Sequence, residues 1–456
     1  MLIDAERLTI FASQIFRALG ASADRADTVA CHLVEANLKG HDSHGVGMIP
    51  NYVYGAQKGY LNVNQDAQLV QDSGAVLLFD NNYGFGQVVG RQSTELAIER
   101  ARSHGMVCAG ARNNYHLGRI GTYGELVADA GLISVHFVNV VGHPPFVSPW
   151  GGRDKRMQTN PFCCAIPTDG EPIILDMATS AIAYGKARLA RMEGVEVPPG
   201  SLFDAEGVPT TDPKVLEEGG SLAPFGMHKG YGLALICELL GGGLAGEWTM
   251  SDVSKQKDMT VNHMLTFIIE PDIFGGLAGF RREVEGMVDW MRACAPAAGV
   301  DKVRLPGEPE RESKVERLVR GIPIDDQSWK GICDAARRAG LDETSVRAML
   351  AVVADKTGYP AEMLDLGMNL EGDLGIDSIK RVEILAAVQE QAPGMPDVDP
   401  AHMSTLTTLG QIVDYMQGLM GAPAAATASA PAPLARRAGS SLRAAVWAQT
   451  AGTCVR

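Results

Sequence analysis

Hydrophobic residues recur at helical spacing near the start of the chain. Between residues 4 and 38 apolar side chains return every three or four positions, and Ser22 stands directly before the second run. This spacing predicts an all-helical N-terminal segment, and a serine before a periodic run is a typical N-cap. We therefore expect two helices, the second capped by Ser22.

Layered α/β structure is predicted for the stretch that follows. Short runs rich in β-branched and aromatic residues alternate with amphipathic runs and glycine turns, the pattern of strands packed against helices. The predicted strands are 75–80, 106–111, 132–141, 162–167 and 172–177, and the predicted helices are 86–105, 121–131 and 230–246. Together with the N-terminal helices, these elements form one α/β domain of enzyme size.

The pattern changes after residue 342, where helical runs continue without strands. The predicted helices are 344–358, 378–392 and 408–420. With a long loop before the second, they fit a small all-α bundle of four-helix type. The Ala/Pro-rich remainder cannot bury a core, so we expect a disordered, mobile tail. The predicted domains are 1–342, 343–420 and the tail 421–456.

Charge and cysteine usage narrow the class of protein. The formal net charge is −14, and residues 343–420 hold twelve acidic side chains against four basic ones. Nucleic-acid binding needs clustered Lys and Arg, so this composition argues against it. The eight cysteines show no CxxC spacing, which is typical of buried or free thiols in a reducing compartment. With an acidic N-terminal stretch and no membrane-length apolar run, we expect a cytoplasmic protein without a membrane partner.

A glycine-rich turn at 84–90 is similar to a dinucleotide-binding fingerprint but departs from it. Gly84, Gly86 and Gly90 follow a predicted strand with the spacing GxGxxxG. The next strand does not end in an acidic residue that could bind a ribose hydroxyl. We therefore predict a turn that packs a helix against its strand, and no Rossmann fold.

Two histidines and a serine lie together in the segment GHDSHGV at 40–46. Ser43 precedes His44, and a serine beside a histidine can orient it for acid–base catalysis. His41 and His44 could instead hold a metal, although no third ligand stands at a recognisable spacing. Simple helix capping is the remaining interpretation, and spacing alone does not decide among the three. We assign no metal site.

Other polar residues follow predicted strands or begin predicted helices. His116 precedes a Gly-Arg-Ile-Gly turn, whose backbone N–H groups and cation would suit phosphates. A loop histidine hydrogen-bonded to its own turn is the alternative. Lys229 stands at the start of the helix at 230–246, where it would suit an anion or simply face solvent. The stretch 305–310 by itself indicates only a turn.

Longer stretches carry a family resemblance. They are HFVNVVGHPPFVSPWGG (136–152), TNPFCCAIP (159–167), LDMATSAIAYGKARLA (175–190) and LFDAEGVPTTDP (202–213). With the motifs above, they resemble the malate/L-lactate dehydrogenase type 2 family over residues 3–342. Within that family the chain looks most similar to the hydroxycarboxylate dehydrogenases, which reduce 2-oxo acids including arylpyruvates. The resemblance implies a non-Rossmann α/β fold, NAD or NADP as cofactor, and a homodimer.

The resemblance also implies roles for individual residues. Ser43 and His44 match the family's Ser-His pair and Asp176 its partner aspartate, which in relatives form a relay that transfers a proton at the substrate. His116 matches a histidine assigned as the acid/base in other members; we favour His44, because Asp176 could fix its tautomer. Cofactor binding is implied for His44, Gly118, Arg119, Ile120, Ile174, Leu175, Asp176, Met177, Ala178, Lys229, Asn262, Gly307, Glu308, Pro309 and Glu310.

Three positions depart from the family pattern. Met48 stands where many members have an arginine that binds the substrate carboxylate, and Gln158 and Phe225 stand where glycine is common. Loss of the cation favours a substrate with an apolar side chain over a dianion.

The last quarter of the chain resembles an acyl carrier protein. Its segment LGIDSIKRVEIL (374–385) is very similar to the carriers of polyunsaturated fatty acid and polyketide synthases. The resemblance assigns covalent 4′-phosphopantetheine to Ser378 and implies a phosphopantetheinyl transferase as partner. A hydroxyl at a helix N-terminus suits a phosphodiester, because the helix dipole favours an anion. Capping of the helix by Asp377 or Ser378 is the alternative.

Two functions follow from the two resemblances. The first is an NAD(P)-dependent 2-hydroxycarboxylate dehydrogenase, which reduces a 2-oxo acid to a 2-hydroxy acid and has a carrier domain appended. The second is a carrier module of a lipid or polyketide assembly line, in which the dehydrogenase part is a passenger or acts on carrier-bound acyl groups.

Overall fold

The computed structural model describes residues 2–341, and every structural statement below concerns these residues. The chain divides into two compact units, one with residues 1–5 and 9–335 and the other with residues 6–8 and 336–456. The central sheet and the candidate site belong to the first unit. The predicted carrier domain at 343–420, with Ser378, and the predicted tail lie outside the described residues.

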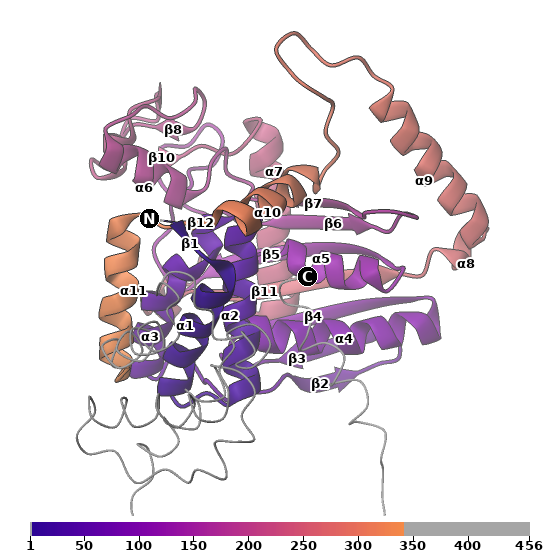
Figure 1. Ribbon diagram of the computed structural model, residues 1–456, viewed down its shortest axis with the longest axis horizontal. Helices are drawn as coiled ribbons and strands as arrows, with labels where there is room; N and C mark the ends of the chain where they lie inside the picture. The colour runs from indigo at the N-terminus through magenta and orange to yellow at the C-terminus, as the bar shows by residue number, and fades with distance from the viewer. Residues whose placement is uncertain (1, 342–456) are drawn as a thin grey trace, which may run out of the picture. The chain divides into compact units, whose positions relative to one another are not determined.

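A mixed sheet of seven strands forms the centre of the first unit, in the order β2-β3-β4-β11-β5-β6-β7 (Figure 1). Within it β3 and β4 pair in parallel, and the other neighbours are antiparallel. The strands are β2 (Gln68–Asp72), β3 (Val76–Asp80), β4 (Met106–Tyr115), β5 (Ile133–Val141), β6 (Phe162–Ile166), β7 (Ile173–Met177) and β11 (Val261–Ile269). A doubly wound Rossmann sheet is mostly parallel, so the prediction of a non-Rossmann α/β fold is confirmed.

Short strands form two further sheets. β1 (Leu2–Ile3) pairs with β12 (Ile322–Pro323), and a three-stranded sheet has the order β10-β8-β9. Its strands are β8 (Leu202–Phe203), β9 (Pro209–Thr210) and β10 (Ser221–Leu222).

Helices precede, connect and follow these strands. They are α1 (Ala5–Ala18), α2 (Ala23–Leu38), α3 (Ile49–Gln57), α4 (Gly86–His104), α5 (Gly121–Asp129), α6 (Tyr184–Glu193), α7 (His228–Cys237), α8 (Asp272–Gly275), α9 (Leu277–Arg292), α10 (Glu308–Arg320) and α11 (Asp326–Ala339). Shorter 3₁₀ turns span Asp42–His44, Val46–Met48, Pro213–Leu216 and Val253–Lys255, and a π-helical segment, Glu238–Gly246, continues α7. The predicted helix at 230–246 is therefore helical throughout but changes type at Glu238.

Helices cover both faces of the sheet. Figure 1 shows α4 and α5 on one face, where Leu77, Phe79 and Val107 are buried in a common core with side chains of α4. On the other face the π-helical segment lies directly on the strands, since a side chain at Gly241 would come within 2.9 Å of the Phe137 carbonyl oxygen. This close approach requires glycine.

The predicted glycine-rich turn is confirmed as a packing device. A side chain at Gly86 would collide with the carbonyl oxygens of Tyr115 and His116. Gly86 therefore lets the first turn of α4 lie against the end of β4, where His116 begins the candidate site.

Two local predictions are corrected. Ser22 is the N-cap residue of α2, but its hydroxyl accepts a hydrogen bond from Arg25 at 2.9 Å and makes no capping bond to the backbone. Cys108, Cys163, Cys164, Cys237 and Cys294 are free thiols, as expected, whereas Cys31 is disulfide-bonded. Among the described helices, none is long and apolar enough to cross a membrane.

Candidate active site

Two histidines that lie 72 positions apart in the sequence meet at the site. Nδ1 of His44 lies 3.1 Å from Nε2 of His116, and the two rings are stacked at 15° to one another. His44 ends the 3₁₀ turn after α2, and His116 follows β4. His116 is 5% exposed, while His44 is partly exposed, so His44 is the member of the pair that a substrate can reach.

The pair continues into a buried hydrogen-bond chain. The hydroxyl of Tyr52, on α3, lies 2.8 Å from Nδ1 of His116, and Nε2 of Gln87, in the first turn of α4, donates to that hydroxyl at 2.5 Å. Both side chains are buried. The sequence predictions missed both side chains, although Gln87 lies within the glycine-rich turn at 84–90.

An asparagine in α2 holds the segment that carries His44. Asn37 Oδ1 accepts the backbone N–H of Val46 at 2.8 Å, and Asn37 Nδ2 donates to Asp42 at 2.7 Å. Asp42 also forms an ion pair with Arg317 of α10 at 2.6 Å. The carboxylate of Asp42 therefore holds the turn in place through its bonds to Asn37 and Arg317.

A second asparagine holds the segment that carries His116. Asn262 Oδ1 accepts the backbone N–H of Leu117 at 2.9 Å, and its Nδ2 donates to the carbonyl oxygen of Asn139 at 3.0 Å. Both polar atoms of the Asn262 side chain, which was predicted to bind the cofactor, therefore form hydrogen bonds within the protein. In the structure Asn262 positions the loop after β4, and a direct contact with the cofactor stays a prediction.

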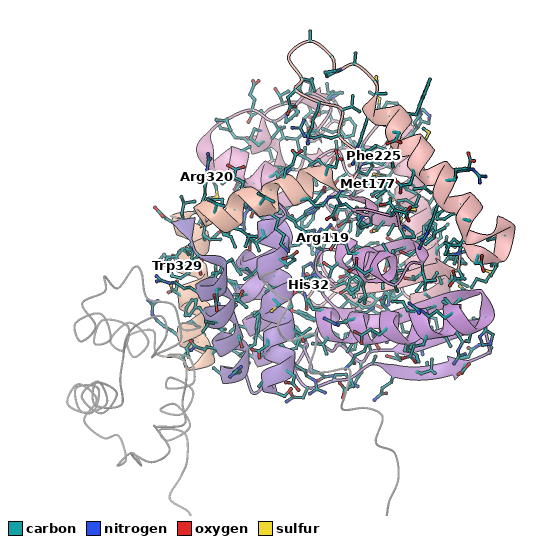
Figure 2. All side chains as sticks on the ribbon, turned by 45° about the vertical axis from the view of Figure 1, so that its right-hand side comes forward. His32, Arg119, Met177, Phe225, Arg320 and Trp329 are labelled. Carbon is teal, nitrogen blue, oxygen red and sulfur yellow. The ribbon has the colours of Figure 1, made fainter. Side chains whose placement is uncertain are left out.

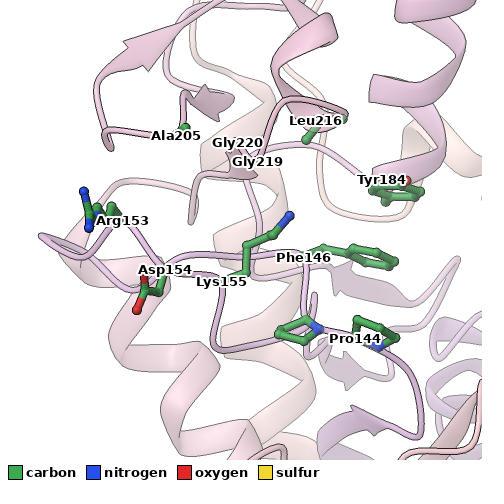
Figure 3. A pocket seen from close by; sticks show the side chains of 11 residues that line it. Pro144, Phe146, Arg153, Asp154, Lys155, Tyr184, Ala205, Leu216, Gly219 and Gly220 are labelled. Atoms are coloured by element: carbon green, nitrogen blue, oxygen red, sulfur yellow. The ribbon is translucent and has the colours of Figure 1, made fainter.

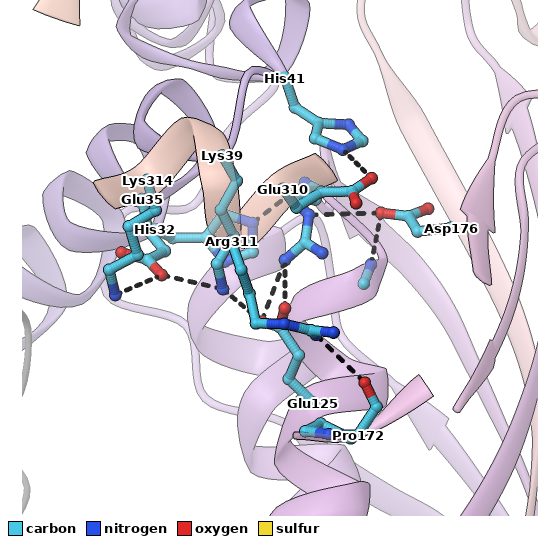
Figure 4. Close-up of polar contacts among 12 residues, drawn as sticks. His32, Glu35, Lys39, His41, Glu125, Pro172, Asp176, Glu310, Arg311 and Lys314 are labelled. Atoms are coloured by element: carbon cyan, nitrogen blue, oxygen red, sulfur yellow. Dashed lines mark hydrogen bonds and ion pairs between the residues drawn. The ribbon is translucent and has the colours of Figure 1, made fainter. Parts of the chain in front are cut away.

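Arg119, labelled in Figure 2, is the centre of a buried charge cluster, and Figure 4 labels its partners His32, Glu125 and Asp176. Its side chain is 1% exposed, its Nη1 donates to both carboxylate oxygens of Glu125 at 3.0 Å, and its Nε lies 3.5 Å from Asp176. Its backbone N–H donates to Nε2 of His32 at 3.0 Å. Burial opposes the charge, but the Glu125 and Asp176 carboxylates raise the pKa of Arg119 above its usual value. The guanidinium is therefore a permanent buried cation.

Further ion pairs extend this cluster towards α10. Lys39 lies 2.7 Å from Glu125 and 2.9 Å from Glu35, and Lys314 of α10 lies 3.0 Å from the same Glu35 oxygen. On another side His41 Nε2 lies 3.3 Å from Glu310, also of α10 (Figure 4). A histidine weighed as a metal ligand in the sequence is thus paired with a carboxylate.

Asp176 makes its hydrogen bonds with the cluster and not with His44. Its Oδ2 accepts the backbone N–H of Gly121 at 2.7 Å, at the start of α5. Its charge still acts on His44, because it raises the pKa of that imidazole. Among the described residues the hydrogen-bond partner of His44 is His116, so the expected relay from Asp176 through the tautomer of His44 stays a prediction.

Burial keeps both histidines neutral near pH 7. Desolvation, the neighbouring His41 and Arg119 outweigh Asp176 and lower the pKa of His44 to about 4. Desolvation and the adjacent histidines lower the pKa of His116 well below its usual value. Each ring therefore carries one hydrogen, and its neighbours decide on which nitrogen.

Three of the predicted cofactor segments lie together. The backbone N–H of Ile174 donates to Pro306 at 3.1 Å, which joins the 174–178 segment to the turn at 307–310. The Asp176 contacts described above join it to the 118–120 turn. Lys229 is exposed in the first turn of α7. Just before α7, the backbone N–H of Phe225 donates to the carbonyl oxygen of Thr179 at 3.0 Å, which joins this part of the chain to the 174–178 segment.

A pocket of about 380 Å³ is lined by residues 144–146 and 153–155 and by Tyr184 at the start of α6 (Figure 3). The rings of Phe146 and Tyr184 stack in its wall at 4.1 Å, and the ring of Phe146 lies 5.2 Å from that of His143. His143 in turn contributes to lowering the pKa of His116. The other lining residues are Ala205, Leu216, Gly219 and Gly220.

The remaining predicted residues flank this region. A side chain at Gly185, next to Tyr184, would lie 3.2 Å from Cβ of Ser43, so α6 begins against the Ser-His pair. Gln158, where glycine was expected, is buried, and its Nε2 donates to the carbonyl oxygen of Pro144 at 2.5 Å and to His143 at 2.9 Å. Gln158 thus fixes the pocket wall. Met48 is partly exposed in the turn after His44.

The chain matches two family models. The malate/L-lactate dehydrogenase model matches residues 3–333, and a phosphopantetheine attachment site model matches residues 347–416. Together they confirm both predicted resemblances.

Individual relatives agree with the first match. Hydroxycarboxylate dehydrogenase B of Escherichia coli (strain K12) is 45% identical over 356 residues, which cover 77% of this chain and 98% of that protein. L-lactate dehydrogenase of Cupriavidus necator is 40% identical over 67% of this chain and 88% of its own. The solved structure of sulfolactate dehydrogenase from Methanocaldococcus jannaschii is 32% identical, with a TM-score of 0.68 over 75% of this chain and 98% of that one. The chain belongs to the malate/L-lactate dehydrogenase family and has a phosphopantetheine attachment domain after its dehydrogenase part.

Proposed function

We propose that this chain reduces a 2-oxo acid to the 2-hydroxy acid with NADH or NADPH, and that His44 supplies the proton. The observation that carries the proposal is the His44–His116 pair, in which a partly exposed imidazole is held by a buried one at 3.1 Å. A positioned imidazole is the commonest proton donor and acceptor in enzymes.

The residues around Arg119 fit a nicotinamide dinucleotide. Nη2 of Arg119 is buried and has no hydrogen-bond partner in the described chain, and Oε2 of Glu310 is in the same state. A buried cation beside the start of α5 suits a phosphate, and an unpaired carboxylate oxygen suits a hydroxyl group. We assign cofactor binding to 118–120, 174–178, Lys229 and 307–310, with Asn262 as the residue that positions the first of these segments.

When bound, the cofactor supplies a hydride to C2 of the oxo acid. The π electrons of the carbonyl group would then move to its oxygen, which takes the Nε2 proton of His44. As this proton leaves, Nδ1 of His44 takes the hydrogen that it shares with Nε2 of His116, and solvent returns one proton to the pair. Asp176 favours the return of this proton, because its charge raises the proton affinity of His44. Ser43, next to His44 and against α6, orients the same turn.

The substrate proposed for the site is a monocarboxylic 2-oxo acid with an apolar or aromatic side chain. Met48 offers no charge to a second carboxylate, and the nearby pocket has an aromatic wall of Phe146 and Tyr184. This wall would contact an apolar side chain of the substrate, and Arg153 and Lys155 on another side of the pocket would suit its single carboxylate.

A panel of 2-oxo acids tests the proposal. Each acid is assayed with NADH and with NADPH by loss of nicotinamide absorbance, using the wild type and Asp176→Asn. We expect reduction of phenylpyruvate by the wild type and lower kcat in the variant, since the charge that assists His44 is lost. Absence of turnover with every acid and both cofactors would refute the proposal.

A second candidate function rests on the phosphopantetheine attachment match at 347–416. We propose that Ser378, inside this range, carries 4′-phosphopantetheine donated by a phosphopantetheinyl transferase. The dehydrogenase part then either acts on acyl groups held by the carrier or works independently of it. Reduction of a 2-oxoacyl group loaded on the full chain, followed by intact mass, distinguishes these two cases.

We also propose that the dehydrogenase part forms a homodimer. The π-helical segment buries Gly241 and Gly242 against the sheet but exposes Leu239 and Leu244 on its other side, by 50% and 67%. Apolar side chains exposed in one surface commonly mark an interface between copies. Light scattering after size exclusion is expected to give twice the chain mass, and Leu244→Glu to shift it towards the monomer.

A further inference from the structure

We propose that Tyr52 and Gln87 are positioning residues that set the tautomer of His44, so that its Nε2–H faces the substrate oxygen. The proposal deepens the function given above and rests on it for its catalytic meaning. It starts from the hydrogen-bond chain Gln87–Tyr52–His116–His44, in which the first three side chains are buried and only His44 is partly exposed.

The first step concerns the hydrogen of Tyr52. Gln87 Nε2 donates to the Tyr52 oxygen at 2.5 Å, and the other neighbour of that oxygen is Nδ1 of His116 at 2.8 Å. Tyr52 is buried, and while Nε2 of Gln87 faces its hydroxyl, Nδ1 of His116 is the acceptor that this hydroxyl contacts. A buried hydroxyl that leaves its hydrogen unpaired is unfavourable, so Tyr52 donates to His116.

The second step concerns the two histidines. Nδ1 of His116 accepts from Tyr52, so a neutral His116 carries its hydrogen on Nε2. That nitrogen lies 3.1 Å from Nδ1 of His44, which therefore accepts. A neutral His44 then carries its hydrogen on Nε2, the ring nitrogen without a hydrogen-bond partner in the described chain. Both rings are neutral near pH 7, because burial lowers the pKa of each.

The opposite order is the alternative that the proposal excludes. It needs the amide of Gln87 turned so that Oε1 faces Tyr52, after which every donor in the chain becomes an acceptor. His44 would then present a bare nitrogen to the site. A carbonyl oxygen is a hydrogen-bond acceptor, so only the order with Nε2–H binds and polarises a 2-oxo group.

Histidine tautomers are measured directly by long-range ¹H–¹⁵N correlation on the full chain labelled with ¹⁵N-histidine. Two other histidines serve as internal references. Nε2 of His32 accepts the backbone N–H of Arg119, which places its hydrogen on Nδ1, and Nδ1 of His263 accepts the backbone N–H of Asn113, which places its hydrogen on Nε2. We expect His44 and His116 to match His263. A match of His44 to His32 in the wild type would overturn the proposal without any variant.

Tyr52→Phe tests the cause of the tautomer. The variant keeps the ring but removes the donor to His116, so His116 and His44 are expected to shift towards the Nδ1–H form while His32 and His263 stay unchanged. Gln87→Leu is expected to shift them less, because Tyr52 keeps its hydroxyl and Nδ1 of His116 remains its acceptor. Gln92→Leu is the matched control, because Gln92 lies on the same helix and bonds instead to Ala67 and Asp66. Unchanged histidines in a folded Tyr52→Phe variant would refute the role of Tyr52.

Binding of oxamate in the presence of NADH or NADPH distinguishes failure of the proposed function from failure of the positioning role of Tyr52. Oxamate presents a carbonyl acceptor, so Tyr52→Phe is expected to bind it about tenfold more weakly, the value of one hydrogen bond of this kind. If the wild type binds no oxamate and reduces no 2-oxo acid, the proposed function fails while the tautomer measurement still stands. If the wild type is active and Tyr52→Phe binds oxamate as tightly, the positioning role fails alone.

Discussion

His44 and His116 share one hydrogen, between nitrogens 3.1 Å apart on nearly parallel rings. The family resemblance makes both residues candidates for the acid/base, and in the structure they differ in burial and in hydrogen bonding. His116 is buried between His44 and Tyr52, with both ring nitrogens engaged. His44 has one nitrogen left for the substrate. These positions support the proposal that His44 reacts and that His116 holds it.

Replacement of the two histidines tests this division. We expect His44→Ala to lower kcat by a factor of about 10² to 10⁴, the usual contribution of a positioned proton donor. His116→Ala is expected to lower kcat less, because His44 remains but its orientation is lost. Steady-state kinetics with the best 2-oxo acid measures both. Near-normal kcat in His44→Ala together with loss of activity in His116→Ala would reverse the assignment.

The sequence predicted the members of this site better than their connections. The motif GHDSHGV and the turn after His116 pointed to two segments that the structure brings together, because short polar runs between apolar elements can be recognised locally. The bond between His44 and His116 joins residues far apart in the chain, and it depends on α2, β4 and the glycine turn before α4 all packing together. Asp176 was expected to fix the tautomer of His44, but its carboxylate accepts a hydrogen bond from the backbone N–H of Gly121, and a backbone donor leaves no signal in the sequence.

Met48 offers a test of substrate choice. An arginine at this position would supply a charged hydrogen bond to a second carboxylate, worth about 1.5 to 3 kcal/mol. We therefore expect the wild type to prefer phenylpyruvate over oxaloacetate, and Met48→Arg to raise kcat/KM for oxaloacetate by about 10- to 100-fold. Met48→Leu is the control and should change neither substrate much. A wild type with higher kcat/KM for oxaloacetate than for phenylpyruvate would contradict the prediction.

Buried histidines make the stability of the dehydrogenase part depend on pH. Burial lowers the pKa of His136 to about 3, and its ring is held between Ser134 and Thr266. An unfolded histidine titrates near pH 6.5, so between pH 6.5 and about 3 the unfolded chain binds more protons than the folded one. Stability is therefore present above this window and falls as the pH falls through it.

His136→Gln tests this pH dependence by removing one buried histidine. The variant is expected to lose less stability between pH 6 and 4.5, with a slope lower by about 1.4 kcal/mol per pH unit, the value of one proton. Urea unfolding followed by tryptophan fluorescence at a series of pH values gives the slope. An unchanged slope in a folded variant would mean that His136 is protonated in the folded state.

The strands were predicted unevenly, for a physical reason. Apolar runs with turn residues on either side indicated β3 to β7, but β2 (Gln68–Asp72) was missed because its five residues are all exposed and it has no buried face. β11 (Val261–Ile269) was missed although it is almost wholly buried, since Asn262, His263 and Thr266 interrupt its apolar pattern. Those polar side chains bond to neighbouring strands and loops. The polar residues that position the site thus kept the sequence pattern from indicating β11, which lies in the middle of the sheet.

The last prediction concerns Ser378, which lies within the phosphopantetheine attachment match at 347–416. A carrier serine is recognised by its transferase through the segment around it, and here Asp377 and the acidic residues Glu371 and Asp373 precede it. Acidic flanks favour docking to a basic transferase surface. Treatment of the full chain with a broad-specificity phosphopantetheinyl transferase and coenzyme A is therefore expected to add the mass of one phosphopantetheine. Ser378→Ala should abolish the gain, and Ser404→Ala, which removes another serine of the matched range, should leave it intact. Absence of any gain in a wild type that reduces 2-oxo acids would mean that Ser378 serves only as a helix cap. A gain that survives Ser378→Ala would place the attachment on another serine.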